Sequence, residues 1–167
     1  MNHIAITKPT AKTLLVPLLA AAAVAIATGP ATAAAPFSGL DGRWSGNGYA
    51  TFEGGQKERL RCSATYRTGG GGASLSMSLR CASASSTINL SGSLHASGSR
   101  VSGSWSESTY GVGGGASGSA SGGSMRLRFS GSTSGTMSVS LGRSSQSVSI
   151  SSQGSALRSV SVSMGRR

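Results

Sequence analysis

From about residue 59 almost to the C-terminus, apolar residues alternate with Ser, Gly or Arg at every second position. The pattern is clearest in SLSMSLRC (residues 74–81), SMRLRF (124–129) and SVSVSM (159–164). A period of two places successive side chains on opposite faces of a β-strand. The alternation therefore predicts an all-β protein whose sheet has one apolar face to bury.

The first 33 residues have the features of a secretory signal peptide. Lys8 and Lys12 lie in a basic beginning, residues 14–27 form an apolar run, and Ala31-Thr32-Ala33 offers small residues for cleavage after Ala33. The apolar run is shorter than the roughly 20 residues that a membrane-spanning helix needs. We expect export, with the mature protein secreted or periplasmic; an uncleaved membrane anchor is the alternative.

The chain after the signal is long enough for one domain with its own core but not for two. We expect a short N-terminal segment at residues 34–42 and a single β-barrel domain at residues 43–167. Within that domain, residues 111–123 (GVGGGASGSASGG) offer no apolar anchor after Val112. We interpret residues 111–123 as a flexible loop at the barrel rim, either a lid or an idle linker.

The mature chain is strongly basic. Loss of Lys8 and Lys12 lowers the net charge from +11 to +9, because 13 Lys and Arg then stand against four Asp and Glu. Such an excess attracts polyanions, here lipopolysaccharide, acidic polysaccharide or a lipid surface. Nucleic acid is not expected, because the arginines are scattered and not interleaved with aromatic residues; alternatively, the charge only maintains solubility and protects strand edges. The outward candidates for an anionic surface are Arg59, Arg61, Arg80, Arg126 and Arg128.

Two cysteines follow the signal, and in an oxidising compartment they are expected to form a disulfide. Cys62 and Cys81 lie on alternating segments joined by a turn at residues 68–73 that contains four consecutive glycines. Antiparallel pairing with residue numbers that sum to 143 puts Cys62 opposite Cys81 on the apolar face, as a cross-strand disulfide requires. The same register pairs Ala64 with Leu79 and Tyr66 with Met77.

The same reasoning predicts further hairpins. A turn at residues 97–100 pairs Ala96 with Val101, Leu94 with Gly103, and Gly92 with Trp105, whose ring would cover the weak glycine position. Turns near residues 133, 144 and 154 give the other pairs, which are Phe129 with Met137, Leu127 with Val139, Leu141 with Val148, and Ile150 with Val160. Nine strands are expected, at residues 43–53, 57–67, 74–82, 87–96, 100–110, 124–131, 136–142, 146–152 and 158–165.

Consecutive strands are thus predicted to be hairpin neighbours. Such a sheet buries one face and removes its edges when it closes on itself. We expect an antiparallel up-and-down β-barrel of eight to ten strands; a two-sheet β-sandwich is the alternative.

Residues that carry chemistry in enzymes are few. His95 is the only histidine after the signal and is expected to face outward, and the four Asp and Glu are spread over four regions. No serine has a plausible His and carboxylate partner, and no His, Cys and Asp occur at metal-ligand spacing. We expect a protein that is not an enzyme and that uses neither a cofactor nor a metal.

Glu107 departs from the alternation, because it continues the inward-facing row of Val101, Gly103 and Trp105. A carboxylate inside a barrel needs a partner. One interpretation is a ligand-binding site near a rim, formed by Trp105, Glu107 and Tyr110. The other is that the strand ends before Glu107, which is then exposed to water.

Residues 38–48 read SGLDGRWSGNG, and Gly42-Arg43-Trp44 resembles the G-x-W motif that opens the first strand of calycins (lipocalins, avidins and relatives). The resemblance implies a barrel floor closed by Trp44 under an arginine from the last strand, and a pocket for a small apolar ligand. Arg158 and Arg166 share the inward parity of the last strand. An even strand count favours Arg166, and an odd count favours Arg158.

A G-x-W first strand with two early cysteines also resembles the small secreted barrel inhibitors of bacterial metalloproteases. In that family a trunk before the barrel enters the protease cleft, and its counterpart here is residues 34–40. Alternation does not decide whether the apolar face points to a core or to lipid, so a small outer-membrane barrel is a further alternative. Short strands at residues 136–142 and 146–152 favour a soluble barrel. We expect an exported binding or interaction module that contacts anionic envelope material or a small ligand.

Overall fold

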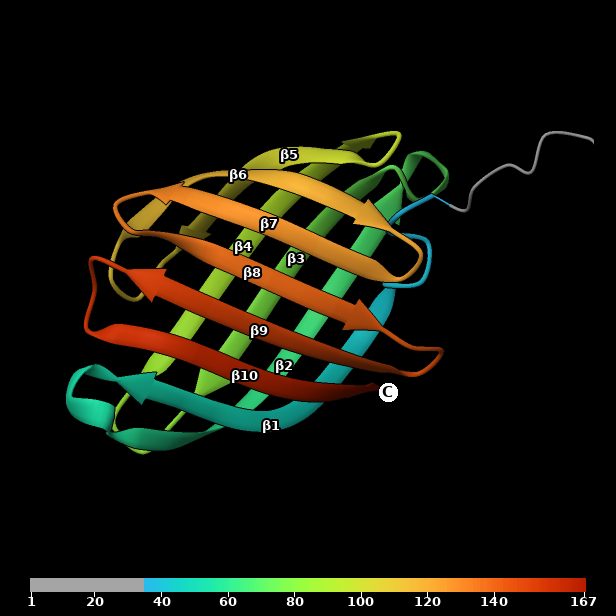
Figure 1. Ribbon diagram of the computed structural model, residues 1–167. Helices are drawn as coiled ribbons and strands as arrows, with labels where there is room; N and C mark the ends of the chain where they lie inside the picture. The colour runs from blue at the N-terminus through green and yellow to red at the C-terminus, as the bar shows by residue number, and fades with distance from the viewer. Residues whose placement is uncertain (1–34) are drawn as a thin grey trace, which may run out of the picture. The chain divides into compact units, whose positions relative to one another are not determined.

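The computed structural model describes residues 35–167, so the expected signal peptide (residues 1–33) lies outside the described residues. Ten antiparallel strands form a closed barrel in which each strand pairs with its neighbours in sequence and β1 pairs with β10 (Figure 1). The expected up-and-down barrel is confirmed, and the expectation of a sandwich is wrong. The strands are β1 (Gly42–Phe52), β2 (Lys57–Gly69), β3 (Ser74–Ala82), β4 (Thr87–Ser97), β5 (Arg100–Glu107), β6 (Val112–Ser121), β7 (Ser124–Gly131), β8 (Ser134–Leu141), β9 (Ser145–Gln153) and β10 (Leu157–Arg166).

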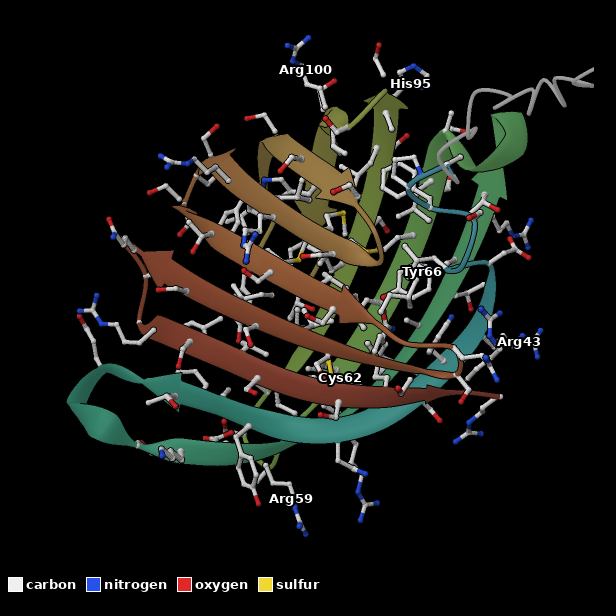
Figure 2. The ribbon with its side chains drawn as sticks, turned by 45° about the vertical axis from the view of Figure 1, so that its right-hand side comes forward. Arg43, Arg59, Cys62, Tyr66, His95 and Arg100 are labelled. Atoms are coloured by element: carbon white, nitrogen blue, oxygen red, sulfur yellow. A yellow bond between two sulfur atoms is a disulfide. The ribbon has the colours of Figure 1, made fainter. Side chains whose placement is uncertain are left out.

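The apolar side chains of the alternating segments point into the barrel. On β2, Leu60 and Cys62 are 6% and 5% exposed, whereas Arg61 between them is exposed. Figure 2 shows the same division, with Arg59 and Arg100 directed away from the barrel and Cys62 inside it. The alternation therefore separates an apolar interior from an outer surface of serine and arginine.

Several hairpins have the expected register. Cys62 lies opposite Cys81 and is joined to it by a disulfide. Gly92 lies opposite Trp105, and Ile150 lies opposite Val160. In these hairpins the apolar parity and the turn agree on one alignment.

Two hairpins are shifted by two residues from the expected register. In the first, Leu127 pairs with Met137, not with Val139, and Phe129 pairs with Gly135, not with Met137. The Phe129 ring covers Gly135 in the observed alignment. A shift of two keeps every side chain on its face, so alternation alone cannot exclude it.

The β8–β9 hairpin has the same kind of error. Leu141 lies opposite Gln146, and Val148 lies opposite Val139. The backbone closes the turn between Gly142 and Ser145, where the Gly142 N–H donates to the Ser145 carbonyl over 2.7 Å. This turn is centred one residue earlier than expected, because Gly142, Ser144 and Ser145 all favour turns and allow either position.

Residues 111–123 are not a flexible loop, because most of them form strand β6. The strand pairs with β5 and β7 on its two sides, and its inward positions hold only Val112, Gly114, Ala116, Gly118 and Ala120. A Cβ added at Gly114 would overlap the backbone oxygen of Ser130. The strand lacks an apolar signal because bulky inward side chains would not fit where its neighbours come so close.

Residues 35–41 close one end of the barrel, here called the closed end. Phe37 is fully buried and Leu40 is 4% exposed. The Phe37 N–H donates to the Gly72 carbonyl in the β2–β3 turn over 3.1 Å. The short N-terminal segment is therefore part of the core and covers the start of β1.

Candidate functional site

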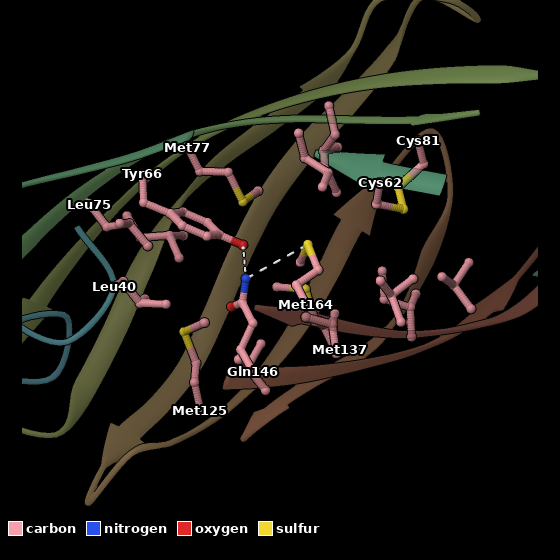
Figure 3. Close-up of a pocket in the computed structure, with 18 residues that line it drawn as sticks. Leu40, Cys62, Tyr66, Leu75, Met77, Cys81, Met125, Met137, Gln146 and Met164 are labelled. Atoms are coloured by element: carbon pink, nitrogen blue, oxygen red, sulfur yellow. Dashed lines mark hydrogen bonds between the residues drawn. A yellow bond between two sulfur atoms is a disulfide. The ribbon is translucent and has the colours of Figure 1, made fainter. Parts of the chain in front are cut away.

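The barrel encloses a cavity of about 50 Å³ behind the closed end (Figure 3). Its walls come from β2, β3, β4, β7, β8, β9 and β10, with Leu40 as a lid from the N-terminal segment. The described residues that line the cavity include no Asp, Glu, Lys, Arg or His. The cavity is thus an apolar compartment with little electrostatic character.

Four methionines and the two cysteines of the disulfide are among the residues that line the cavity. All four methionines beyond Met1 line it, namely Met77, Met125, Met137 and Met164, and so do Cys62 and Cys81. Methionine has an unbranched, polarisable side chain that adapts to irregular partners. Walls of this kind can reshape around a guest more easily than walls of branched residues.

Gln146 is the one side chain with an amide among those that line the cavity. It lies on β9 in the inward row of Val148 and Ile150 and is 2% exposed. Its Nε2 donates to the Tyr66 hydroxyl over 3.2 Å and lies 3.9 Å from the Met164 sulfur (Figure 3). Its Oε1 is buried without a hydrogen-bond partner. A buried carbonyl oxygen without a hydrogen-bond partner destabilises the fold.

Tyr66 on β2 meets Gln146 on β9 inside the barrel, with β1 and β10 between the two strands. Burial raises the pKa of its phenol above the usual 10.0, although the hydrogen bond from Gln146 opposes the change. The phenol therefore keeps its proton at neutral pH. Together the two side chains offer a hydroxyl and an amide at one point of an otherwise apolar cavity.

The floor of the barrel is built on Trp44, which is 1% exposed. Its indole N–H donates to the Leu40 carbonyl over 2.8 Å, and its ring meets Tyr66 edge to face with centroids 6.5 Å apart. The Arg166 guanidinium lies 4.6 Å from the centre of the Trp44 ring and donates to the carbonyls of Gly39 and Asp41. A cation over an indole face is a favourable arrangement.

Of the two arginines considered for the floor, the structure places only Arg166 there. Ten strands are an even number, so β10 ends beside the start of β1, and Arg166 lies opposite Trp44. Arg158 lies at the other end of β10 and forms an ion pair with Glu53. The irregular pairing between Thr51 and Phe52 also breaks the parity that made Arg158 a candidate.

The structure does not bring Trp105, Glu107 and Tyr110 together as a ligand site. None of the three lines the cavity. Trp105 packs against Phe129, with its indole N–H buried and unpaired. Tyr110 is 63% exposed, and its hydroxyl lies 2.7 Å from that of Ser86.

Glu107 is buried and not exposed to water, so the second interpretation is also wrong. Its carboxylate accepts hydrogen bonds from the backbone N–H groups of Asn89, Thr109 and Tyr110 at 2.7–2.9 Å. Burial acts to raise the pKa of Glu107, but these hydrogen bonds outweigh it and hold the pKa below the usual 4.5. The residue organises the β5–β6 turn.

The five arginines expected on an anionic surface do not form one patch. Arg59 and Arg61 lie on β2 and Arg80 on β3, whereas Arg126 and Arg128 lie on β7. In the ring of ten strands, β2 and β7 are as far apart as two strands can be, so the two groups are on opposite sides.

A different group of arginines gathers at the closed end, and the sequence pattern does not single it out. The Arg167 N–H donates to the Arg43 carbonyl over 2.8 Å, and the Arg166 N–H donates to the carbonyl of Ser144, beside Arg143, over 3.0 Å. The side chains of Arg43, Arg143 and Arg167 are exposed. We call these three residues the closed-end arginines. The β9–β10 hairpin brings Arg143 near Arg167, and the pairing of β1 with β10 brings Arg43 to the same end.

Gln146 was also missed, although its signal was present. It shares the inward parity of Val148 and Ile150, and a polar amide at an inward position is as unusual as the carboxylate of Glu107. Among residues 35–167, no group of three or more His, Cys, Asp or Glu could hold a metal ion. The same residues include no helix that is long and apolar enough to cross a membrane.

No protein-family model matches the sequence, and no curated protein matches it. Solved structures are similar in fold. Rv2717c from M. tuberculosis has a TM-score of 0.63 at 16% identity, over 78% of this chain and 94% of that chain. The S-type phycobiliprotein lyase CPES from Guillardia theta has a TM-score of 0.53 at 12% identity, over 78% of this chain and 89% of that chain.

Both neighbours are ten-stranded antiparallel barrels of the calycin-like fold. The likeness in fold is consistent with the kind of barrel that the resemblance of Gly42-Arg43-Trp44 implied. At identities this low, the likeness extends to the fold alone.

Proposed function

We propose that this chain is an exported, non-enzymatic carrier that binds a small, largely apolar ligand inside the barrel. The observation that carries the proposal is the cavity of about 50 Å³, lined by the four methionines and marked by a buried amide oxygen without a partner. For comparison, an engineered cavity of about 150 Å³ holds benzene. The ligand is therefore small, or it binds with movement of the methionine side chains.

The four methionines provide a direct test, because all of them line the cavity. The mature protein is labelled with ¹³C at the methionine methyl groups and titrated with 1-chlorohexane, and the methyl resonances are followed by NMR. We expect saturable shifts of these resonances. In Val148→Phe, which adds volume to the cavity wall, we expect the shifts to weaken. Resonances that stay in place for the wild-type protein up to the solubility limit of the probe would overturn the proposal.

A second candidate function is contact with an anionic surface of the cell envelope. The closed-end arginines support it, because little negative charge lies beside them. Of the four acidic residues, only Asp41 lies at the closed end. Exposed like charges attract polyanions, and the attraction weakens as salt screens it.

The test compares two charge-removing variants on vesicles with and without phosphatidylglycerol. The first variant replaces Arg43, Arg143 and Arg167 by Gln, and the second replaces Arg59, Arg61 and Arg80. We expect salt-sensitive binding to anionic vesicles that the first variant loses and the second keeps. Equal losses would show that only total charge matters, and no binding by the wild-type protein would exclude this function.

A protease-inhibitor role and an outer-membrane location receive less support. An inhibitor of that kind needs a trunk that is free to enter a cleft, and Phe37 and Leu40 in the corresponding segment are buried. An outer-membrane barrel needs apolar side chains directed outward, and on β2 the apolar side chains point inward while Arg59 and Arg61 point outward.

A further inference from the structure

We infer that the cavity selects a neutral hydroxyl compound, with the hydroxyl group held between Gln146 and Tyr66. The inference rests on the proposed carrier function and deepens it. It starts from the one polar point of the cavity, where Gln146 Nε2 donates to the Tyr66 hydroxyl over 3.2 Å and Gln146 Oε1 has no partner.

The hydrogen-bonding capacity left at this point includes both a donor and an acceptor. The Tyr66 oxygen receives a hydrogen bond from Gln146, so the phenolic proton remains free to donate. Gln146 Oε1 remains free to accept. A ligand hydroxyl that donates to Gln146 and accepts from Tyr66 completes both groups at once.

A hydroxyl group also fits if the Gln146 amide is turned over. In that orientation the amide oxygen accepts from the Tyr66 hydroxyl, and the amide nitrogen is the group left to donate. A hydroxyl accepts as well as donates, so it satisfies either arrangement. A ketone or an ether only accepts and satisfies one of them.

The absence of charged residues from the described cavity lining disfavours a carboxylate ligand. The described lining residues include no Lys, Arg or His that could pair with a carboxylate. A carboxylate buried without a cation or several hydrogen-bond donors is strongly disfavoured. The apolar remainder of the ligand lies along the methionines, whose flexible side chains set its shape less strictly than its polarity.

Three probes of equal chain length test the inference on the mature protein: 1-hexanol, hexanoate and 1-chlorohexane. Gln146→Leu removes the amide at similar volume, and Gln153→Leu is the matched control, because Gln153 lies on the same strand and is exposed. Affinities come from methionine-methyl NMR titrations at pH 7, and a thermal melt of each variant shows that it is folded.

We expect the wild-type protein to bind 1-hexanol at least about tenfold more tightly than hexanoate. We expect the affinity ratio of 1-hexanol to 1-chlorohexane to fall by about tenfold in Gln146→Leu and to stay unchanged in Gln153→Leu. An unchanged ratio in Gln146→Leu, or hexanoate binding as tightly as 1-hexanol, overturns the inference and leaves the carrier function standing. If 1-chlorohexane and 1-hexanol both fail to bind the wild-type protein, the carrier function itself is wrong.

Discussion

Trp105 on β5 meets Phe129 on β7 edge to face, with ring centroids 5.8 Å apart, although β6 runs between these two strands. The rings can meet because the β6 positions beside them are Gly114 and Ala116. The glycine-rich strand and the aromatic pair are therefore one packing unit. This unit fills the interior beside β5 and β6, and neither of these strands lines the cavity.

Gly114→Ala tests this unit. The added Cβ would overlap the Ser130 backbone oxygen, so we expect the free energy of unfolding in urea to fall by about 1–3 kcal/mol. Gly115→Ala is the control, because a Cβ there meets nothing closer than 3.9 Å. Equal effects of the two substitutions would contradict the packing described for β6.

Reduction of the Cys62–Cys81 disulfide is expected to destabilise the barrel. The bridge closes a loop with a sequence separation of 19. Loss of a disulfide that closes a loop of this size lowers the free energy of unfolding by about 3 kcal/mol. The measurement is urea unfolding with and without a phosphine reductant, and a variant with both cysteines replaced by Ala, insensitive to the reductant, serves as the control. A midpoint that the reductant leaves unchanged in the wild-type protein would contradict this prediction.

Glu107→Gln should destabilise the protein in a pH-dependent way. The pKa of Glu107 is lower in the folded than in the unfolded chain, so its ionisation stabilises the fold above pH 4.5, and this contribution disappears as the pH falls through the folded pKa. We expect a loss of about 1–2 kcal/mol at pH 7, from weakened hydrogen bonds to the Asn89, Thr109 and Tyr110 N–H groups, and a smaller loss at about pH 3, both measured by urea unfolding.

The control for that experiment is Glu53→Gln. The Glu53 side chain is 60% exposed in its ion pair with Arg158, and exposed ion pairs contribute little. A constant difference between Glu107→Gln and the wild-type protein over the same pH range would show that the carboxylate charge is not responsible.

Arg166→Met should loosen the closed end. It removes the cation over Trp44 and the hydrogen bonds to Gly39 and Asp41, and we expect a loss of about 1–2 kcal/mol. Amide hydrogen exchange in residues 35–41 should become faster, while exchange in β3 and β4 keeps its rate at matched stability. Arg143→Met, in the exposed β8–β9 turn, is the control. Unchanged exchange in residues 35–41 would argue against a role of Arg166 in holding the segment.

Much of the barrel follows from residue parity, because inward and outward positions differ so clearly in this chain. Parity aligned Cys62 with Cys81 and Gly92 with Trp105. It failed for Phe129 and Leu141, where a shift of two residues preserves the faces and the true alignment depends on which small residues form the turn. It failed for β6 because close packing there requires glycine and alanine, which carry no apolar signal.

The candidate site was less predictable than the fold. Glu107 was a candidate from the sequence, yet its carboxylate accepts hydrogen bonds from three backbone N–H groups in and beside its own turn and is not free to bind a ligand. Gln146 was not predicted as a site residue, yet it carries the unpaired oxygen of the cavity. Which inward polar group is satisfied depends on the turn geometry and on contacts such as that of Gln146 with Tyr66, 80 residues apart.

The pairing of β1 with β10 also imposes an order on folding. Hairpins from β2 to β9 join neighbours in sequence and can form as soon as both of their strands have been synthesised. Trp44 cannot be covered by Arg166, nor β1 gain its second partner, until the last strand has arrived. The interior is therefore sealed only after β10 has been synthesised and has paired with β1, and until then the barrel stays open along one side.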